Sequence, residues 1–262
     1  MVRGLYTSAA GMNAQQNNID VTSNNIANVN TTGFKKDRIE FADLMYQSLN
    51  YTANATSEST NNPTGIDVGL GVKITGIQKS FIQGSLTETG NDLDLAIQGK
   101  GFFQITTPTG DTQYTRNGAF KVDSEGTLVN GQGYKVEPEI SVPYNLTNVS
   151  VSQDGIITAM NPIDNTITTL GQLTITDFIN PAGLAPKGNS LYAVTDTSGP
   201  AITGNPGTEA FGSLQQGMLE ASNVQLVNAM VDLITAQRAY EANSKSLTTT
   251  DAMLQQVNQL KR

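Results

Sequence analysis

The chain has 262 residues and a formal net charge of −8, and it contains neither cysteine nor histidine. The acidic charge argues against electrostatic binding of nucleic acid. The two missing residue types exclude disulfides, thiol nucleophiles, zinc sites of the usual kind and catalysis by a histidine base.

Residues 1–33 are predicted to form a helix that packs against another helix. Four apolar residues recur at a spacing of seven, namely Leu5, Met12, Ile19 and Ile26. Between Gly4 and Phe34 the only charge is Asp20, and the other polar side chains are amides and hydroxyls. Asparagine is a mediocre helix former, and an uncharged polar face can be covered without burying a charge. We therefore expect a helix that is weak alone, orders on assembly and stops at Gly33.

No export or membrane signal is visible along the chain. The first 16 residues contain no continuous apolar run of the length that a secretory signal requires. No stretch approaches the roughly 20 apolar residues of a membrane-spanning helix. We expect any export from the cytoplasm to use a route without a cleaved signal peptide.

Residues 34–66 are predicted to form an extended connector. Its first part, residues 39–49, places apolar residues at near-helical spacing, namely Phe41, Leu44, Met45 and Leu49. The following residues 51–63 are rich in threonine, asparagine and serine, with Glu58 their only charge. That composition is typical of an extended or flexible segment.

Residues 67–215 are predicted to form one small antiparallel β domain. Apolar residues alternate at Val72 and Ile74 and again at Leu93, Leu95 and Ile97, as strands require. Further strands are expected near residues 149–151, 156–159, 170–175 and 191–194. Turn dipeptides recur at Thr109-Gly110, Asn117-Gly118, Glu125-Gly126 and Asn130-Gly131. Asn-Gly between short apolar runs indicates a hairpin, because both residues tolerate positive φ.

Residues 216–262 are predicted to close the chain with a long amphipathic helix over residues 219–260. Five of its residues recur at a spacing of seven, namely Leu226, Leu233, Tyr240, Leu247 and Leu254. Such a repeat favours a supercoiled helix with a partner, although an ordinary surface helix stays an alternative. Ser222 and Gln225 fit a capping box at its start. The fold class expected is α+β, with both terminal helices paired as a coiled coil and the connector and β domain inserted between them.

Two short patterns imitate ligand-binding loops. Gly99-Lys100-Gly101 lacks the spacing of a phosphate loop and precedes a strand, so a turn is favoured. Residues 123–126, Asp-Ser-Glu-Gly, resemble a fragment of a calcium loop but lack the later acidic ligand, so a hairpin turn is favoured. We predict no catalytic residue, no cofactor and no metal.

Two charged patterns leave more than one interpretation open. Asp92 and Asp94 alternate on a predicted strand and could act as an acid/base pair, although a solvated strand face or a salt bridge is favoured. Arg238, Glu241 and Lys245 lie at helical spacing. They form either ion pairs within the helix or contacts between subunits.

Three stretches resemble the flagellar rod and hook protein family. They are SNNIANVNTTGFK at residues 23–35, AIQGKGFF at residues 96–103 with YTRNG at 114–118, and QGMLEASNV at 216–224 with QRAYE at 237–241. The resemblance covers essentially the whole chain. Within the family the chain is most similar to distal rod subunits: it has no room for the additional outer domain of a hook subunit, and residues 41–63 resemble the insert that sets the distal rod apart.

The resemblance implies a structural subunit that polymerises into a rigid hollow helical drive shaft. The terminal helices would form its inner tube, and residues 51–63 would bridge neighbouring subunits. The partners implied are other copies of the chain, the proximal rod and hook proteins at its two ends, the surrounding periplasmic and outer-membrane rings, and the flagellar export apparatus. The location implied is the basal-body rod that crosses the periplasm. The assembly interface expected comprises Leu5, Met12, Ile19, Ile26, Leu226, Leu233, Tyr240, Leu247 and Leu254.

Two alternatives remain at the level of sequence. One is a proximal rod or hook subunit of the same family. The other is a secreted hydrolase of cell-wall polymer that uses Asp92, Asp94 or Asp123, and it would leave the two heptad patterns without a purpose.

Overall fold

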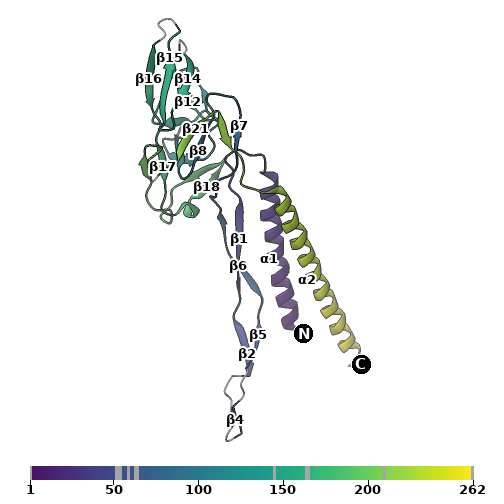
Figure 1. Cartoon of the computed structure of the whole chain (residues 1–262). Coiled ribbons are helices and arrows are strands. Elements are labelled where there is room, and N and C mark those ends of the chain that lie inside the picture. The colour runs from purple at the N-terminus through teal and green to yellow at the C-terminus, as the bar shows by residue number, and fades with distance from the viewer. Residues whose placement is uncertain are drawn as a thin grey trace. The chain divides into compact units, whose positions relative to one another are not determined.

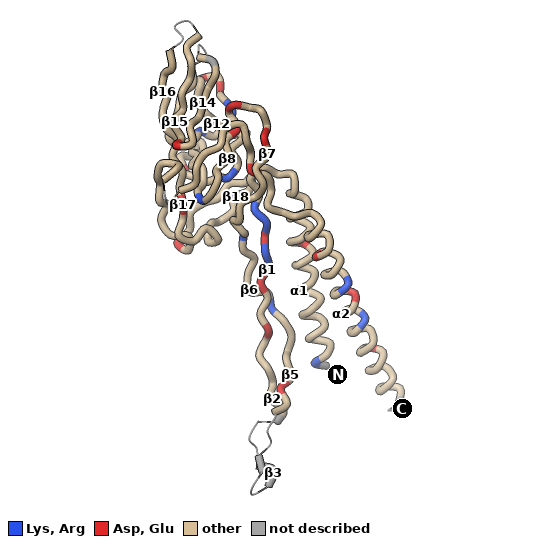
Figure 2. The backbone as a smooth tube through the Cα atoms, in the orientation of Figure 1, with Lys and Arg blue, Asp and Glu red and all other residues tan. Residues whose placement is uncertain are grey.

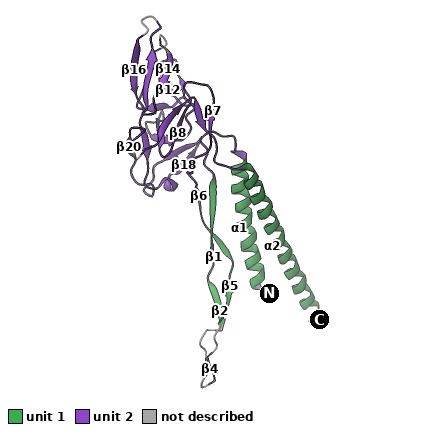
Figure 3. Cartoon of the chain, viewed as in Figure 1, with its two compact units in different colours: residues 1–26, 37–78, 226–262 green, residues 27–36, 79–225 purple. Residues whose placement is uncertain are grey.

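The chain is divided into two compact units in a computed structural model that describes residues 2–50, 55–57, 60–61, 65–143, 146–162, 166–208 and 211–260. The helical unit comprises residues 1–26, 37–78 and 226–262, and the β unit comprises residues 27–36 and 79–225 (Figure 3). Each unit is therefore assembled from segments that are distant in sequence.

Two helices, α1 (Val2–Ala27) and α2 (Leu226–Leu260), form most of the helical unit (Figure 1). They contact each other, since the Oγ atoms of Ser8 and Ser246 lie 3.3 Å apart. A methyl group on Gly11 would press against the side-chain amide of Asn243. Helix contact between the two ends of the chain is thus present, while supercoiling of the pair stays a prediction.

The buried face of α2, called the helix seam, consists of small and polar residues. Its residues Ala229, Ala236 and Thr250 are buried, and Asn243, at the same spacing of seven, is half-buried. Small side chains allow two helix axes to approach closely, because the distance between packed helices depends on the residues in contact. The apolar heptad that we expected to form the seam is instead half-buried or exposed, as described below.

Both predicted helix boundaries need correction. The N-terminal helix ends at Ala27 and not at Gly33, although Gly33 does have the positive φ of 68° expected of a stop residue. The C-terminal helix begins at Leu226 and not at residue 219. Ser222 does not cap it, since its Oγ accepts a hydrogen bond from the backbone N–H of Val224.

The rest of the helical unit is β ribbon. Strand β1 (Asp37–Asp43) pairs with β6 (Val72–Lys79), and β2 (Tyr46–Asn50) pairs antiparallel with β5 (Ile66–Gly69). The near-helical reading of residues 39–49 is therefore wrong, and the alternation of charged Arg38 and Glu40 with apolar Ile39 and Phe41 is the pattern that prevails. Most of residues 51–63 lie outside the described residues, apart from the paired strands β3 (Ala55–Ser57) and β4 (Thr60–Asn61).

The described residues include two places where the ribbon contacts α1. Gly71, at the turn before β6, lies against Thr7 and Ala10 of α1, where its missing side chain leaves room. At the other place Asn25, buried near the end of α1, bonds to the backbone of Asp37 in both directions. Its Nδ2 donates to the Asp37 carbonyl and its Oδ1 accepts from the Asp37 N–H, each at 2.8 Å.

The Asn25 amide is expected to matter for stability. Replacing Asn25 with alanine leaves the N–H and C=O of Asp37 without these bonds, so we expect the free energy of unfolding to fall by about 1–3 kcal/mol. The measurement is urea unfolding followed by circular dichroism. Asn13→Ala, which removes an exposed amide from the same helix, is the control and should change stability by less than about 0.5 kcal/mol. Equal losses in both variants would contradict this role for Asn25.

The described strands of the β unit pair in antiparallel orientation. Its largest sheet has the order β11 (Lys121–Val122), β12 (Leu128–Val129), β13 (Lys135–Glu137), β9 (Phe102–Thr106), β10 (Thr112–Thr115), β19 (Leu191–Ala193) and β18 (Ala185–Gly188). In that sheet β17 (Ile175–Asp177) also pairs with β9 and with β20 (Ile202–Gly204). The predicted antiparallel strands are confirmed, but the bounds differ from the expected residues 67–215: residues 67–78 belong to the helical unit, and the β unit continues to residue 225.

Smaller sheets complete the β unit. A three-stranded sheet contains β14 (Thr147–Val151), β15 (Ile156–Met160) and β16 (Ile167–Gln172). Two further pairs join distant parts of the chain: β8 (Leu95–Gln98) with β21 (Ser213–Gln216), and β7 (Leu86–Glu88) with β22 (Met218–Glu220). A short 3-10 helix, η1, spans Pro181–Gly183.

Strand β9 lies between two apolar clusters. Successive strand residues point to opposite faces. Phe103 accordingly joins the main core, where its ring meets Phe120 at 5.0 Å between centroids. Phe102 joins an aromatic cluster on the other side with Tyr114, Phe178, Leu184 and Tyr192. This buried framework holds the loops that carry the site described next.

Turn predictions in the β unit are mostly confirmed. Thr109-Gly110, Glu125-Gly126 and Asn130-Gly131 all lie in loops between antiparallel neighbours. Asn117-Gly118 is not a hairpin turn, and Gly118 lies against the backbone of Leu95. Sequence reasoning also placed Asp92 and Asp94 on a strand, whereas β8 begins only at Leu95.

Candidate functional site

The segment that follows α1 and the segment that precedes α2 meet inside the β unit. The N–H of Gly33 donates to the carbonyl of Glu220 at 2.8 Å. The N–H of Lys36 donates to Oδ1 of Asn223 at 2.7 Å, and Nδ2 of Asn223 donates to the carbonyl of Ser80 at 2.7 Å. Backbone and amide bonds therefore join both terminal segments to each other and to the start of the β unit.

A buried ion triad lies at this junction. The side chains of Lys35 and Glu220 are both 0% exposed, and Nζ of Lys35 is 2.6 Å from Oε1 of Glu220. Arg116, whose side chain is 4% exposed, places Nη1 at 3.4 Å from Oε2 of Glu220. One carboxylate thus holds a cation from the N-terminal segment and a cation from the β unit.

Neighbouring backbone groups add hydrogen bonds to the triad, although Nε of Arg116 is buried without a hydrogen-bond partner among the described residues. Oε1 of Glu220 accepts a further bond from the N–H of Gly84 at 2.8 Å. Nζ of Lys35 donates to the carbonyl of Ile82 at 2.9 Å, and Nη2 of Arg116 donates to the carbonyl of Gly99 at 2.8 Å. A buried ion pair is tolerated only with such additional bonds, because removing charges from water is costly.

The triad contains two cations and one carboxylate. Burial lowers the pKa of Lys35 below its ordinary value, against the opposing effect of Glu220. Burial likewise lowers the pKa of Arg116, although Glu220 and Asp177 act in the opposite direction. The guanidinium also lies over the ring of Phe102, with 5.3 Å to the centroid. Glu220 is therefore the group on which both buried cations depend.

Sequence reasoning missed this triad. Lys35, Arg116 and Glu220 lie in three different stretches of the chain, and each is one member of a stretch that resembles the rod and hook family. The signal was the presence of an isolated charge inside an otherwise uncharged or apolar motif. No local pattern says that three such charges meet.

The nine residues predicted for the assembly interface lie on the two helices of the helical unit. Seven are half-buried, namely Leu5, Met12, Ile19, Ile26, Leu233, Leu247 and Leu254, whereas Leu226 and Tyr240 are exposed. The first turns of α2 expose still more apolar surface: Val227 is 73% exposed and Ile234 is 55% exposed, with Met230 and Val231 between them. Figure 2 shows few charged residues along α1, in agreement with its amide-rich composition. The role of the nine predicted residues in assembly stays a prediction.

The carboxylates considered for catalysis do not form a pair. Asp92 is exposed, whereas Asp94 is buried and accepts bonds from Oγ1 of Thr89 at 2.6 Å and Nδ2 of Asn91 at 3.1 Å. Asp123 lies at an exposed turn, where its Oδ1 accepts from the N–H of Ser124 at 2.7 Å. In the part of the chain that the structure describes, no three acidic side chains gather as a metal site.

The charged residues of α2 form at least one pair within the helix. Nη1 of Arg238 lies 3.4 Å from Oε2 of Glu241, and both side chains are exposed. Exposed pairs of this kind contribute little to stability. An ion pair within the helix is therefore confirmed for Arg238 and Glu241. A contact of these residues with another subunit stays a prediction.

Comparison with known proteins identifies the family. Three family models match: the flagella basal body rod protein at residues 5–35, the flagellar hook protein FlgE/F/G D1 domain at residues 96–159, and the C-terminal part of the flagellar basal body rod FlgEFG proteins at residues 215–260. The chain is 48% identical to the flagellar basal-body rod protein FlgG of Borreliella burgdorferi over 100% of both chains. It is 45% identical to that of Agrobacterium fabrum over 96% of this chain and 97% of the relative, and 44% identical to that of Caulobacter vibrioides over 99% and 100%. The chain therefore belongs to the FlgG family of bacterial flagellar basal-body rod proteins.

Proposed function

We propose that this chain is a structural subunit of the distal rod of the bacterial flagellum. The observation that carries the proposal is similarity to FlgG rod proteins along the whole chain, at 48% and 44% identity for two of them. Asp92 is exposed, whereas Asp94 is buried and bonded to Thr89 and Asn91, so these two carboxylates do not support a cell-wall hydrolase. The relatives named as FlgG favour the distal rod over a proximal rod or hook subunit.

In this proposal the subunits polymerise through their terminal helices into a rigid hollow helical shaft that carries torque to the hook. The apolar surface on α2, around Val227 and Ile234, supports this assembly. Burying a side chain such as valine or isoleucine stabilises a contact by about 1.5–3 kcal/mol. A surface that contacts a different surface on the next copy, without closing a ring, generates an open helical filament.

The proposed partners follow from this role. They are other copies of the chain, the proximal rod and hook proteins at the two ends of the distal rod, the periplasmic and outer-membrane rings around it, and the flagellar export apparatus. The proposed location is the rod as it crosses the periplasm. Over the described residues, no helix has the length and apolar character needed to cross a membrane.

The apolar surface of α2 offers a direct test. We expect Ile234→Asp to abolish rod assembly, because a contact that covers this surface of α2 would then have to bury an unpaired carboxylate. The measurements are electron microscopy of basal bodies and swimming in soft agar, in cells whose own copy is deleted. Thr235→Asp is the matched control, since it adds the same charge at the next residue, which is also exposed but polar.

The outcome decides between assembly through this surface and assembly through other parts of the chain. Rods and normal swimming are expected for Thr235→Asp. Normal rods in Ile234→Asp, with the variant present in them, would remove this surface of α2 from the assembly interface. Circular dichroism of both purified variants should show equal helix content, which separates an assembly defect from a folding defect.

A further inference from the structure

The β unit contains two places where an asparagine precedes a glycine, Asn117-Gly118 and Asn130-Gly131. Glycine has no side chain to shield its backbone nitrogen. That nitrogen can therefore attack Cγ of the preceding asparagine and close a cyclic imide, with loss of the side-chain amide. The two dipeptides have the same sequence, so a difference in their reactivity has to come from the structure around them.

The loop that contains Asn130 is closed by its backbone and open at its tip. The N–H of Gly133 donates to the carbonyl of Asn130 at 3.0 Å, and the N–H of Asn130 donates to the carbonyl of Tyr134 at 2.9 Å. Gly131 and Gln132, between these bonds, are exposed. Among the described residues beyond its chain neighbours, nothing lies within 4 Å of the position that a methyl group on Gly131 would take. Water and base therefore reach this glycine.

The side chain of Asn130 folds back over the loop. Its Oδ1 accepts hydrogen bonds from the N–H groups of Gln132 and Tyr134, each at 2.9 Å. An asparagine bonded in this way to the residue two positions on lies over the intervening peptide, which contains the nitrogen of Gly131. Negative charge develops on Oδ1 when a nucleophile adds to Cγ, and backbone donors directed at that oxygen stabilise the charge, as in an oxyanion hole.

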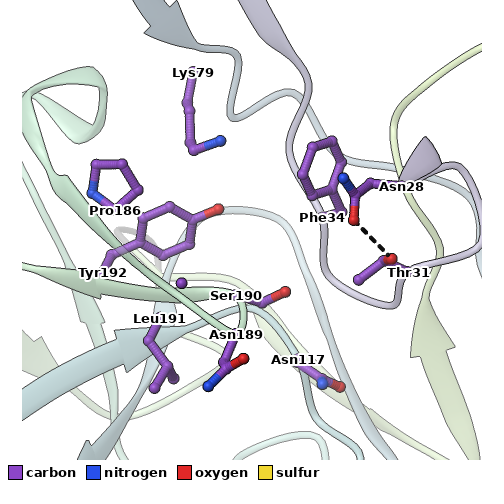
Figure 4. A pocket seen from close by; sticks show the side chains of 11 residues that line it. Asn28, Thr31, Phe34, Lys79, Asn117, Pro186, Asn189, Ser190, Leu191 and Tyr192 are labelled. Atoms are coloured by element: carbon purple, nitrogen blue, oxygen red, sulfur yellow. Dashed lines mark hydrogen bonds between the residues drawn. The ribbon is translucent and has the colours of Figure 1, made fainter. Parts of the chain in front are cut away.

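Asn117 accepts similar bonds, but the backbone beside it is locked. Its Oδ1 accepts from the N–H of Ala119 and from Oγ1 of Thr32, each at 3.1 Å, and Figure 4 shows its side chain at the wall of a pocket of about 430 Å³. Gly118 is buried against the backbone of Leu95, whose N–H donates to the Gly118 carbonyl at 3.0 Å. Ring closure rotates the peptide between asparagine and glycine. At this dipeptide the rotation must first separate two packed backbones.

We infer that Asn130 is a site of spontaneous deamidation in the folded chain and that Asn117 is protected from the same reaction. Base removes the proton from the nitrogen of Gly131, a bond forms between this nitrogen and Cγ of Asn130, and the bond from Cγ to Nδ2 breaks. Nδ2 leaves as ammonia after taking up a proton. Water then opens the imide at either carbonyl and gives aspartate or isoaspartate. The inference goes beyond the proposed function and does not depend on polymerisation.

The two products differ in their effect on the loop. Aspartate at position 130 keeps an oxygen that accepts from Gln132 and Tyr134, and a charged acceptor makes such bonds stronger. Isoaspartate adds a methylene to the backbone, so the bonds of the Asn130 backbone to Gly133 and Tyr134 no longer match in length. Those bonds lie next to the pairing of Val129 with Lys135. Isoaspartate therefore loosens the connection between β12 and β13, whereas aspartate only adds a negative charge.

The first test is peptide mapping of the purified full-length chain after incubation at mildly alkaline pH, compared with an unincubated sample. Trypsin cleaves after Arg116, Lys121 and Lys135, so the two dipeptides fall in separate peptides. Mass spectrometry should show exchange of an amide for an acid at Asn130, and isoaspartyl methyltransferase should label that peptide. We expect conversion at least about tenfold faster than at Asn117, which must wait for local opening of the core. The rate should rise with pH, because the attacking nitrogen must lose a proton.

The second test separates structure from sequence. In urea both dipeptides lose their surroundings, so Asn117 should convert at the rate of Asn130 to within about threefold. Asn130 should convert in the folded chain at least as fast as in urea. Gly131→Ala should slow conversion at Asn130 at least about tenfold, because a side chain then crowds the attacking nitrogen. The same variant should leave conversion at Asn117 in urea unchanged, which serves as its internal control.

Three results would overturn the inference. Equal conversion of the two dipeptides in the folded chain would show that sequence alone sets their reactivity. Conversion of Asn130 in urea but not in the folded chain would show that the loop protects it. Undiminished conversion in Gly131→Ala would exclude attack by the nitrogen of that residue. None of these measurements uses a rod, so each of these failures leaves the proposed function intact, and a failure of the proposed function leaves the deamidation result standing.

Discussion

Replacing Glu220 with glutamine is expected to lower the free energy of unfolding by about 3–5 kcal/mol, the usual loss when one partner of a buried ion pair is removed. Glutamine keeps the size of the side chain but removes the carboxylate that faces Lys35 at 2.6 Å and Arg116 at 3.4 Å. Two cations then remain in the interior without the carboxylate that contacts both of them. The loss should be measured by urea unfolding of the purified chain, followed by circular dichroism.

An exposed ion pair in the same unit provides the control. Lys135 and Glu139 are 3.5 Å apart, with side chains 43% and 61% exposed. Glu139→Gln removes the same kind of group from a solvated position, so the expected change is below about 1 kcal/mol. If the two variants lost equal amounts of stability, the burial of Glu220 would not be the cause of its importance.

A third variant separates the effect of the buried charges from the effect of the volume that the three side chains fill. Replacing all three members with apolar residues, as Lys35→Met, Arg116→Met and Glu220→Leu, removes the buried charges together. Apolar replacements of buried ion groups are often neutral or stabilising. We therefore expect this triple variant to be more stable than Glu220→Gln, and the opposite order would show that the backbone contacts of the triad dominate over its charge balance.

The position of the triad suggests why a charged junction is useful in the proposed rod. Lys35 belongs to the segment that continues from α1, and Glu220 belongs to the segment that leads into α2. The chain passes from each helix into the β unit through one of these two segments. Ion pairs and backbone bonds at 2.6–2.9 Å are directional, whereas apolar contact is not. A directional junction resists rotation of the segments against the core.

The terminal helices could be predicted from sequence because a spacing of seven is a local pattern. The start of α2 could not, since Leu219 falls in phase with Leu226 and extends the repeat. In the structure Leu219 instead lies in β22, opposite Thr87 of β7. Tertiary pairing with a distant strand overrides local propensity, and no window of the sequence contains both strands.

The helix seam was missed for a different reason. Sequence analysis follows large apolar residues, whereas the buried positions of α2 are Ala229, Ala236 and Thr250. Small residues bury little area each, so they give a weak periodic signal although they determine how closely two helices approach. The ion triad could not be predicted at all, because it joins residues from three separate stretches of the chain.

The rule that Asn-Gly indicates a hairpin turn holds at one of the two Asn-Gly dipeptides and fails at the other. Asn130-Gly131 lies in the loop between β12 and β13, as the sequence predicts, whereas Gly118 lies against the core strand β8. The N–H of Leu95 donates to the carbonyl of Gly118 at 3.0 Å, and this close approach leaves no space for a side chain. Glycine at position 118 therefore serves packing between two backbones and does not serve a turn.

Gly118→Ala is consequently expected to lower the free energy of unfolding by about 3 kcal/mol, at the upper end of the cost of overpacking a core. The added methyl group would overlap the backbone carbonyl of Leu95, which is itself buried, and would press on the ring of Phe103 at 3.2 Å. Neither neighbour is the flexible end of a surface side chain, so the backbone must shift. Urea unfolding and the yield of soluble protein are the measurements.

Gly131→Ala makes the same chemical change in the other dipeptide and should act in the opposite direction. Nothing lies within 4 Å of the position that its methyl group would take, and its φ is not positive. Alanine then reduces the freedom of the unfolded chain and should raise stability by about 0.4–1 kcal/mol. Equal effects of the two substitutions would show that the Asn-Gly sequence itself determines the outcome. Opposite effects would show that the contact between Gly118 and Leu95 determines it, because composition and local sequence are matched.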